Sequence, residues 1–131
     1  MNYLLDTSVL IDLLRNRIYA WSFIGDHKDD RIMTSWICAA EVLEGINRES
    51  SERLEAKKMI FWKIIDQLGE IVEFDRDGAE EAGKLRAVTV IRQNPVGDLD
   101  ILIAATSISR DATLVTGNTK HFSKILGLKV V

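Results

Sequence analysis

The stretch 3–11 constrains the fold of this chain more than any other. An apolar run from Tyr3 to Leu5 predicts a buried strand, and Asp6 ends it. A second apolar pattern, with helical spacing, begins at Val9. Ligands of open α/β sheets bind at the carboxyl ends of the strands, so Asp6 is predicted to lie at such an end. The alternative is that Asp6 simply caps the following helix.

The remaining chain repeats this alternation. Further strands are predicted at 31–35, 70–74, 113–116 and 128–131, and helices at 8–16, 19–30, 36–46, 51–68, 75–92 and 98–106. The pattern predicts an α/β fold, a three-layer α/β/α sandwich around a central parallel sheet of four to five short strands. Because no repeat, linker or shift in composition divides the sequence, we expect a single domain over residues 1–131.

Several residues mark the expected helix ends. Gly45 is compatible with the end of one helix, Ser50 or Ser51 caps the next, and Gly69 ends it. Asp75 or Asp77 begins the helix that 94–97 breaks.

Composition excludes some classes of protein. Cys38 is the one cysteine, which rules out an internal disulfide and a cysteine-based metal cluster. No apolar run approaches the roughly 20 residues that span a bilayer, and no basic segment precedes the first strand, so we expect a cytoplasmic protein with no membrane partner. The net charge of −3 argues only weakly against a nucleic-acid partner, because carboxylates that hold cations also make a chain acidic.

Three acids are predicted to meet at the carboxyl edge of the sheet. Asp6 follows the first strand, Glu41 lies on the helix after the second, and Asp100 begins the helix before the fourth. Converging carboxylates repel each other and are tolerated when cations lie between them. Hard oxygen ligands of this kind suit Mg²⁺ or Mn²⁺ rather than zinc.

The same positions carry a family resemblance. It rests on Leu4-Leu5-Asp6-Thr7-Ser8-Val9, on Ser35 with Glu41-Val42-Leu43-Glu44-Gly45, on Asp100-Ile101-Leu102-Ile103-Ala104-Ala105, and on Leu114-Val115-Thr116-Gly117-Asn118 with Phe122. Together these motifs resemble the PIN-domain nucleases, and among them the VapC-type toxins of type II toxin–antitoxin pairs. The resemblance extends from residue 3 to residue 122 in the expected order.

The resemblance implies roles for individual residues. Asp6, Glu41 and Asp100 would be catalytic and would hold one or two Mg²⁺ or Mn²⁺ ions, directly or through water. Ser8 and Thr116 would support these ligands. The family often has a further acid at the position of Asn118 or of His121, and this sequence has neither. Asn118 can still coordinate or donate a hydrogen bond, so the number of ions stays open.

Asp98 and Asp100 compete for the same role. Two residues on a helix are separated by about 200° of rotation, so both cannot face one cleft. We expect Asp100 to be the ligand and Asp98 to be the helix cap. His121 is expected either to contact a phosphate or to be an ordinary surface residue.

The expected activity is metal-dependent hydrolysis of RNA phosphodiester bonds by a toxin that a cognate antitoxin inhibits. The resemblance also implies a homodimer and a toxin–antitoxin hetero-oligomer. One alternative is a catalytically weakened PIN-like domain that binds RNA or a partner without cleaving. Another is a phosphoryl-accepting domain with Asp6 as nucleophile, although such phosphatases carry a second acid where this chain has Ser8.

Overall fold

A central sheet of five parallel strands organises the protein. The computed structural model describes residues 1–49, 52–92 and 96–131. The strands are β1 (Asn2–Leu5), β2 (Arg31–Ser35), β3 (Ile71–Val72), β4 (Thr113–Val115) and β5 (Lys129–Val130). Their order across the sheet is β3-β2-β1-β4-β5, and every neighbouring pair is parallel.

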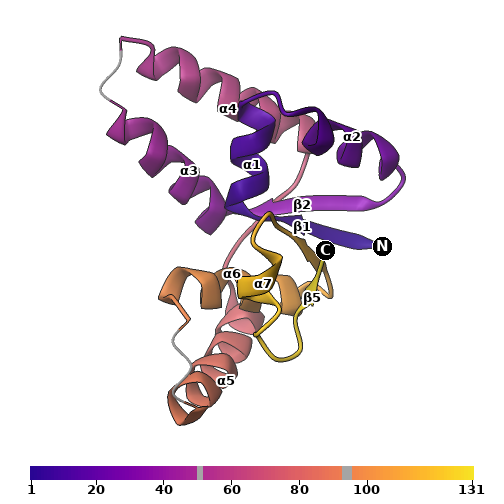
Figure 1. Ribbon diagram of the computed structural model, residues 1–131, viewed down its shortest axis with the longest axis vertical. Coiled ribbons are helices and arrows are strands. Elements are labelled where there is room, and N and C mark those ends of the chain that lie inside the picture. The colour runs from indigo at the N-terminus through magenta and orange to yellow at the C-terminus, as the bar shows by residue number, and fades with distance from the viewer. Residues whose placement is uncertain (50–51, 93–95) are drawn as a thin grey trace.

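Helices cover both faces of this sheet. They are α1 (Thr7–Leu14), α2 (Ile18–Asp26), α3 (Trp36–Arg48), α4 (Leu54–Leu68), α5 (Arg76–Arg92), α6 (Asp98–Ser109) and α7 (Thr119–Phe122). Figure 1 shows α1 to α4 on one side of the sheet and α5 to α7 on the other. The predicted three-layer α/β/α architecture with a parallel sheet is therefore confirmed.

The strand order creates a switch point beside β1. From β1 the chain proceeds outward to β2 and β3, and it then crosses to β4 on the other side of β1. The crevice outside the carboxyl ends of two such strands is where open α/β sheets bind ligands. The backbone N–H of Asp6 donates to the carbonyl of Val115 at 2.9 Å, so the ladder between β1 and β4 reaches this edge.

The core is built on the two central strands. Leu4 and Leu5 of β1 and Leu114 of β4 are fully buried, as expected for parallel strands that are covered on both faces. Leu10 of α1 and Phe61 of α4 are also fully buried. This packing fixes the carboxyl end of β1 between two layers of helices.

Several predicted element ends differ from the structure. α3 continues to Arg48, so Gly45 does not end it, and the strand predicted at 70–74 is reduced to Ile71–Val72. α4 begins at Leu54, and the predicted caps Ser50 and Ser51 lie outside the described residues. Residues 94 and 95 of the predicted break lie outside them as well.

Two predicted helix ends are confirmed. The carboxylate of Asp75 accepts from the backbone N–H of Gly78 at 3.0 Å, which caps the start of α5. Gly69 ends α4 with φ of 82°, a left-handed conformation that favours glycine.

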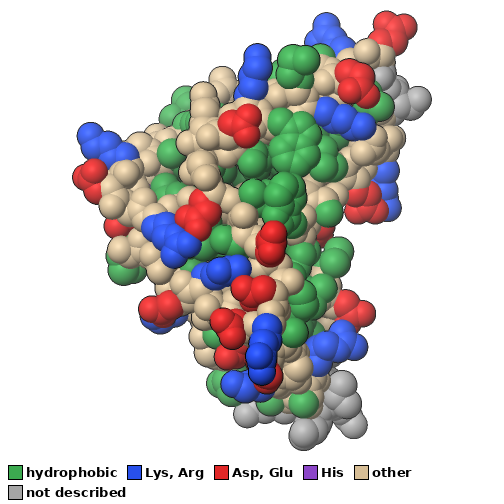
Figure 2. Space-filling view, turned by 180° about the vertical axis from the view of Figure 1, so that it is seen from behind, with side chains coloured by type: hydrophobic (Ala, Val, Ile, Leu, Met, Phe, Trp, Pro, Cys, Tyr) green, Lys and Arg blue, Asp and Glu red, His purple; other side chains and the backbone are tan. Residues whose placement is uncertain are grey.

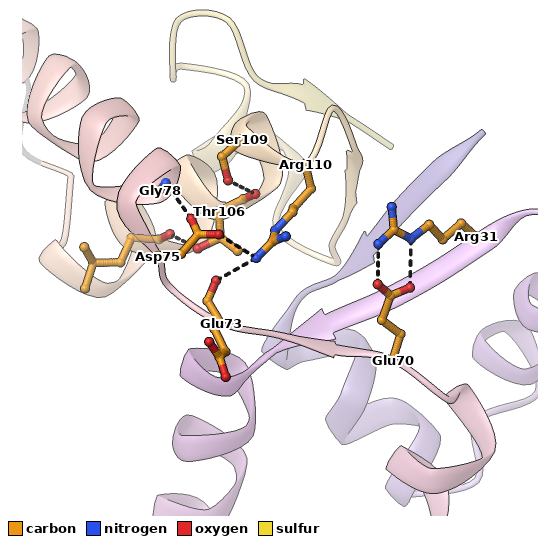
Figure 3. Close-up of polar contacts among 9 residues, drawn as sticks. Arg31, Glu70, Glu73, Asp75, Gly78, Thr106, Ser109 and Arg110 are labelled. Carbon is orange, nitrogen blue, oxygen red and sulfur yellow. Dashed lines mark hydrogen bonds and ion pairs between the residues drawn. The ribbon is translucent and has the colours of Figure 1, made fainter.

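Arg110 ties the entry of α5 to the end of α6. Its guanidinium donates to the carbonyl of Glu73 at 3.2 Å and to the carboxylate of Asp75 at 3.0 Å (Figure 3). The same figure shows Arg31 of β2 paired with Glu70 just before β3. These contacts lie away from the carboxyl ends of β1 and β4 and support the sheet and the α5–α6 layer.

One side of the molecule exposes an apolar surface. Met59 and Ile60 of α4, Trp36 of α3 and Leu99 of α6 are each about half exposed. Figure 2 shows hydrophobic side chains gathered along this side. No helix in the described part of the chain is long and apolar enough to cross a membrane.

Candidate carboxylate site at the strand ends

Asp6 is a buried acid at the switch point, with only 5% of its surface exposed. It occupies the N-cap position of α1, yet its side chain makes no capping hydrogen bond to the described backbone of that helix. Instead, its Oδ2 atom accepts from the hydroxyl of Thr116 at 2.7 Å and from that of Ser8 at 3.3 Å. The alternative that Asp6 simply caps α1 is therefore wrong.

The turn after β4 is built around the same carboxylate. The Thr116 hydroxyl, which donates to Asp6, accepts from the backbone N–H of Asn118 at 3.0 Å. The Ser8 hydroxyl accepts from the backbone N–H of Gly117 at 3.0 Å. Ser8 and Thr116 thus lie where supports of Asp6 were predicted, and they join α1 to the turn.

Asn118 reaches this network through its backbone. It is the N-cap residue of α7, and its exposed side chain makes no capping bond within the described chain. No hydrogen bond of its side-chain amide within the described residues therefore supports the predicted role of Asn118, which stays a prediction.

Glu41 faces the same edge from α3. Its Oε1 atom accepts from the hydroxyl of Thr7 at 2.7 Å. Burial raises the pKa of Glu41, the hydrogen bond from Thr7 opposes this, and the negative charges of Asp6, Asp100 and Glu44 raise the pKa further. Asp6 and Asp100 are therefore close enough to Glu41 for their charges to act on it.

Cys38 lies beneath these acids. It is fully buried, and burial raises the pKa of its thiol to about 11, an effect that the charges of Asp6 and Glu41 reinforce and hydrogen bonds from Ser35 and Thr7 oppose. The thiol is consequently neutral at physiological pH and adds no third charge beneath the carboxylates.

Asp100 enters the site in contact with His121. The Nε2 atom of His121, on α7, lies 2.7 Å from Oδ2 of Asp100, and about a third of each side chain is exposed. Gly97 is the N-cap residue of α6, and a Cβ atom at this position would come within 3.6 Å of the Asp100 carboxylate. The spacing of acids in the sequence gives no indication of this contact.

Asp98 does not cap α6, contrary to prediction. The N-cap residue is Gly97, and Asp98 is the first helical residue, 76% exposed and paired with Arg86 of α5. The expectation that Asp98 and Asp100 do not face the same cleft agrees with the structure, because Asp98 pairs with Arg86 and Asp100 contacts His121. The exposed pair with Arg86 leaves Asp100 as the acid that reaches Glu41 electrostatically.

The donor set fits a divalent cation of the Mg²⁺ type. No three His, Cys, Asp or Glu side chains within residues 1–49, 52–92 and 96–131 are grouped closely enough to enclose a metal ion. Mg²⁺ does not need such an enclosure, because it keeps several waters and is usually held by one or two carboxylates together with substrate phosphates. Burial is the main cause of the raised pKa of Glu41, and the charges of Asp6 and Asp100 add to it; a bound cation would relieve this repulsion.

Two contacts of this site escape sequence reasoning. The bond from Thr7 to Glu41 joins residues 34 positions apart, and His121 reaches Asp100 across 21 positions. The sequence did contain one signal for the position of His121, the Thr-Gly-Asn turn. Asn118 of this turn is the N-cap residue of α7, the helix that carries His121.

The family model and the relatives that match this chain agree with one another. The model of the PIN domain matches residues 3–127. A ribonuclease VapC of Rickettsia bellii is 30% identical over all of this chain and 96% of that protein. A tRNA(fMet)-specific endonuclease VapC of Salmonella typhimurium is 27% identical over 99% of this chain and 96% of that protein.

The solved structures agree with these relatives. The crystal structure of VapBC2 from Rickettsia felis bound to a DNA fragment from their promoter contains a chain with a TM-score of 0.90 and 27% identity. The alignment covers 100% of this chain and 98% of that chain. The similarity therefore extends over the whole architecture, including the turns that carry the carboxylates.

Proposed function

This chain belongs to the PIN domain family, and from that premise we propose that it is a divalent-metal-dependent endoribonuclease. The names of its relatives support cleavage of RNA. The observation that carries the proposal is Asp6, a buried acid that forgoes helix capping and faces the switch point of the sheet. We further propose that residues 1–131 act as one domain.

We assign the ion-binding role to Asp6, Glu41 and Asp100. Each can supply a carboxylate oxygen. Asp6 is the N-cap residue of α1, Glu41 lies on α3, and Asp100 lies in the first turn of α6. Ser8 and Thr116 fix the orientation of Asp6, and Thr7 fixes that of Glu41. Hydrogen-bond partners of ligands commonly change metal affinity or activity by about 10- to 100-fold when they are removed.

The chemistry divides between the ion and the protein. A bound Mg²⁺ or Mn²⁺ supplies a lowered pKa for water and neutralises the charge that develops on the phosphate. The carboxylate of Glu41, held by the hydroxyl of Thr7, is the group that we propose to accept the proton released by the attacking water. Asp6 stays fixed by its two hydroxyl donors while the substrate binds.

We propose an antitoxin as the protein partner. A solved structure that matches the whole of this chain is a VapBC complex from Rickettsia felis, which supports a toxin role with a cognate antitoxin. Exposed apolar side chains on α2 and α4, including Ile18, Tyr19, Met59 and Ile60, offer contact surface for an apolar partner segment. Homodimer formation and a toxin–antitoxin hetero-oligomer remain predictions that light scattering on the purified protein, with and without the antitoxin, tests directly.

The function is tested with the partner-free protein and a defined RNA pool. We expect discrete fragments in the presence of Mg²⁺ or Mn²⁺, no fragments with a chelator, and none from Asp100→Asn. The matched control is Asp26→Asn, which changes an exposed acid on α2 in the same way and should cleave normally.

Three results would contradict the proposal in different ways. Identical RNA in every lane, together with RNA binding in a filter assay, would favour the catalytically weakened PIN-like domain. Cleavage that persists with the chelator would remove the metal from the mechanism. Acyl-phosphate labelling of Asp6 would favour the phosphoryl-accepting alternative.

A further inference from the structure

The site divides into two parts that differ in their donor atoms. Among the described residues, the side chains that donate hydrogen bonds to Asp6 and Glu41 are hydroxyls, so the hydrogen-bonding groups of this part are all oxygen. Around Asp100 the close partner is the imidazole nitrogen of His121. The second part is thus a mixed pair of oxygen and nitrogen.

We propose that Asp100 and His121 together form a cation-binding pair and that the imidazole nitrogen makes the protein prefer Mn²⁺ to Mg²⁺. This inference rests on the proposed function and deepens it, because it names the residue that selects the ion. The proposed function gives His121 no role, because it is neither a residue that supports Asp6 nor one of the three acids.

The position of the pair favours binding of an ion from solution. Oδ2 of Asp100 and Nε2 of His121 are 2.7 Å apart, and a third of each side chain is exposed. Among the described residues, Asp100 provides the only hydrogen bond to the His121 ring. A cation that binds both atoms would replace the hydrogen bond between them, with the neutral imidazole carrying its hydrogen on Nδ1, and would displace no second hydrogen-bond partner of the ring within the described chain.

The short helix α7 holds the imidazole in place. Phe122 is only 2% exposed, and its ring contacts that of His121 edge-on with centroids 5.5 Å apart. The backbone of Asn118, at the start of α7, donates to Thr116, which in turn donates to Asp6. His121 is consequently held by the same turn that fixes Asp6, so the two parts of the site keep their relative position.

The chemistry of the donors gives the direction of the preference. Mg²⁺ favours oxygen and gives up its waters reluctantly, whereas first-row transition metals accept imidazole nitrogen. A site whose donors are all oxygen atoms lacks the nitrogen donor that would favour Mn²⁺ over Mg²⁺. On this side of the cleft, Asp100 would supply the oxygen donor and His121 the nitrogen donor.

The test measures the two dissociation constants, for Mn²⁺ and for Mg²⁺, by calorimetry on the partner-free protein. We expect His121→Asn to reduce the preference for Mn²⁺ over Mg²⁺ by about tenfold. We expect His121→Asp, which restores an oxygen donor, to bind Mg²⁺ more tightly than His121→Asn does. Lys120→Ala, an exposed neighbour on α7, should leave the ratio unchanged.

A spectroscopic measurement reports the nitrogen directly. Electron spin-echo modulation of protein-bound Mn²⁺ detects a coordinated imidazole nitrogen. The chain has two histidines, and His27, at the end of α2, stacks on Phe23. Figure 1 shows α2 on the other side of the sheet from α7. The nitrogen signal should disappear in His121→Asn and persist in His27→Asn, with thermal melts confirming that both variants are folded.

The outcomes separate this inference from the proposed function. If the wild-type protein binds Mn²⁺ and cleaves RNA but shows no nitrogen modulation, or if His121→Asn keeps the wild-type ratio, His121 is not a ligand and the inference is overturned while the nuclease proposal stands. If the wild-type protein binds neither ion, both fall together.

Discussion

Two helices of this protein start directly at the end of a strand, α1 after β1 and α3 after β2. The side chains of their N-cap residues bind different partners. Asp6 and Ser35 are both buried N-cap residues with extended backbone, at ψ of 164° and 157°. The Ser35 hydroxyl accepts from the backbone N–H of Cys38 at 3.1 Å, which is ordinary helix capping. The Asp6 carboxylate points across the sheet to Thr116.

The difference separates a structural cap from a functional acid. Asp is as good a cap as Ser, so the sequence alone favours capping at both positions. α1 nonetheless starts without a side-chain cap within the described residues. A buried carboxylate that is turned away from its own helix has its negative charge available to the cleft, and the turn at Ser35 has no such charge to offer.

The largest effect is expected from Asp6→Asn. The change keeps the shape of the side chain but removes the charge, so cleavage should fall by about 10²- to 10³-fold. Because Asp6 does not cap α1, the melting temperature should stay within a few degrees of the wild-type value. Single-turnover cleavage and thermal unfolding measure the two quantities separately; a large loss of stability with normal cleavage per folded molecule would make Asp6 a cap after all.

Thr116→Val should produce the next largest effect. The substitution removes the 2.7 Å bond to Asp6 with little change in volume, and we expect cleavage to fall by about 10- to 100-fold. Thr34→Val is the matched control, because the buried Thr34 hydroxyl donates to the carbonyl of Leu5 and not to a carboxylate. Thr34→Val should lose about 1 kcal/mol of stability and keep its activity. Equal activity loss in both variants would contradict a specific role for Thr116.

Ser35→Ala is expected to change stability alone. Loss of this cap should lower the free energy of unfolding by about 1 kcal/mol, measured by urea denaturation. Cleavage per folded molecule should match that of the wild-type protein. A loss of activity that exceeds the loss of folded protein would show that the two strand ends do not differ as described.

The smallest effect is expected from Glu41→Gln in the absence of metal. The pKa of Glu41 is raised in the folded protein, so folding is most favoured below the ordinary pKa of a glutamate, and stability declines as the pH rises through the raised value. The neutral amide avoids this penalty and can still accept from Thr7. The melting temperature at pH 7 should therefore rise by about 2 °C and depend less on pH between 4 and 7. An unchanged pH dependence would mean that neither burial nor the neighbouring charges raise the pKa of Glu41.

The fold was predictable because short apolar runs and helical patterns alternate along the whole chain. The carboxylate edge followed from that alternation, since Asp6, Glu41 and Asp100 each come shortly after a predicted strand or at a predicted helix start. Gly69 and Asp75 were also readable, because a left-handed helix end and a capping carboxylate depend on residues near in sequence.

What the sequence could not reveal depends on contacts between distant segments. Asp98 is an acid at the start of a helix, which is typical of a cap, but its side chain pairs with Arg86 of α5 and the N-cap residue is Gly97. Gly45 looks like a helix end, but the helix continues past it to Arg48, with Val42 and Ile46 buried against the core. The approach of His121 to Asp100 follows from the packing of α7, which no periodicity in the sequence encodes.

The sheet order has a consequence for how the protein is made. Asp6 meets Thr116 across 110 positions of sequence, and the backbone N–H of Thr116 is in turn held by the carbonyl of Val131 beside β5. Contacts of such long range form late, and a chain emerging from the ribosome presents its N-terminal strand first. A nascent chain therefore carries Asp6 well before β4 and β5 emerge, and it cannot assemble the carboxylate edge until they have emerged. The order of the strands thus makes the site one of the last features of this fold to form.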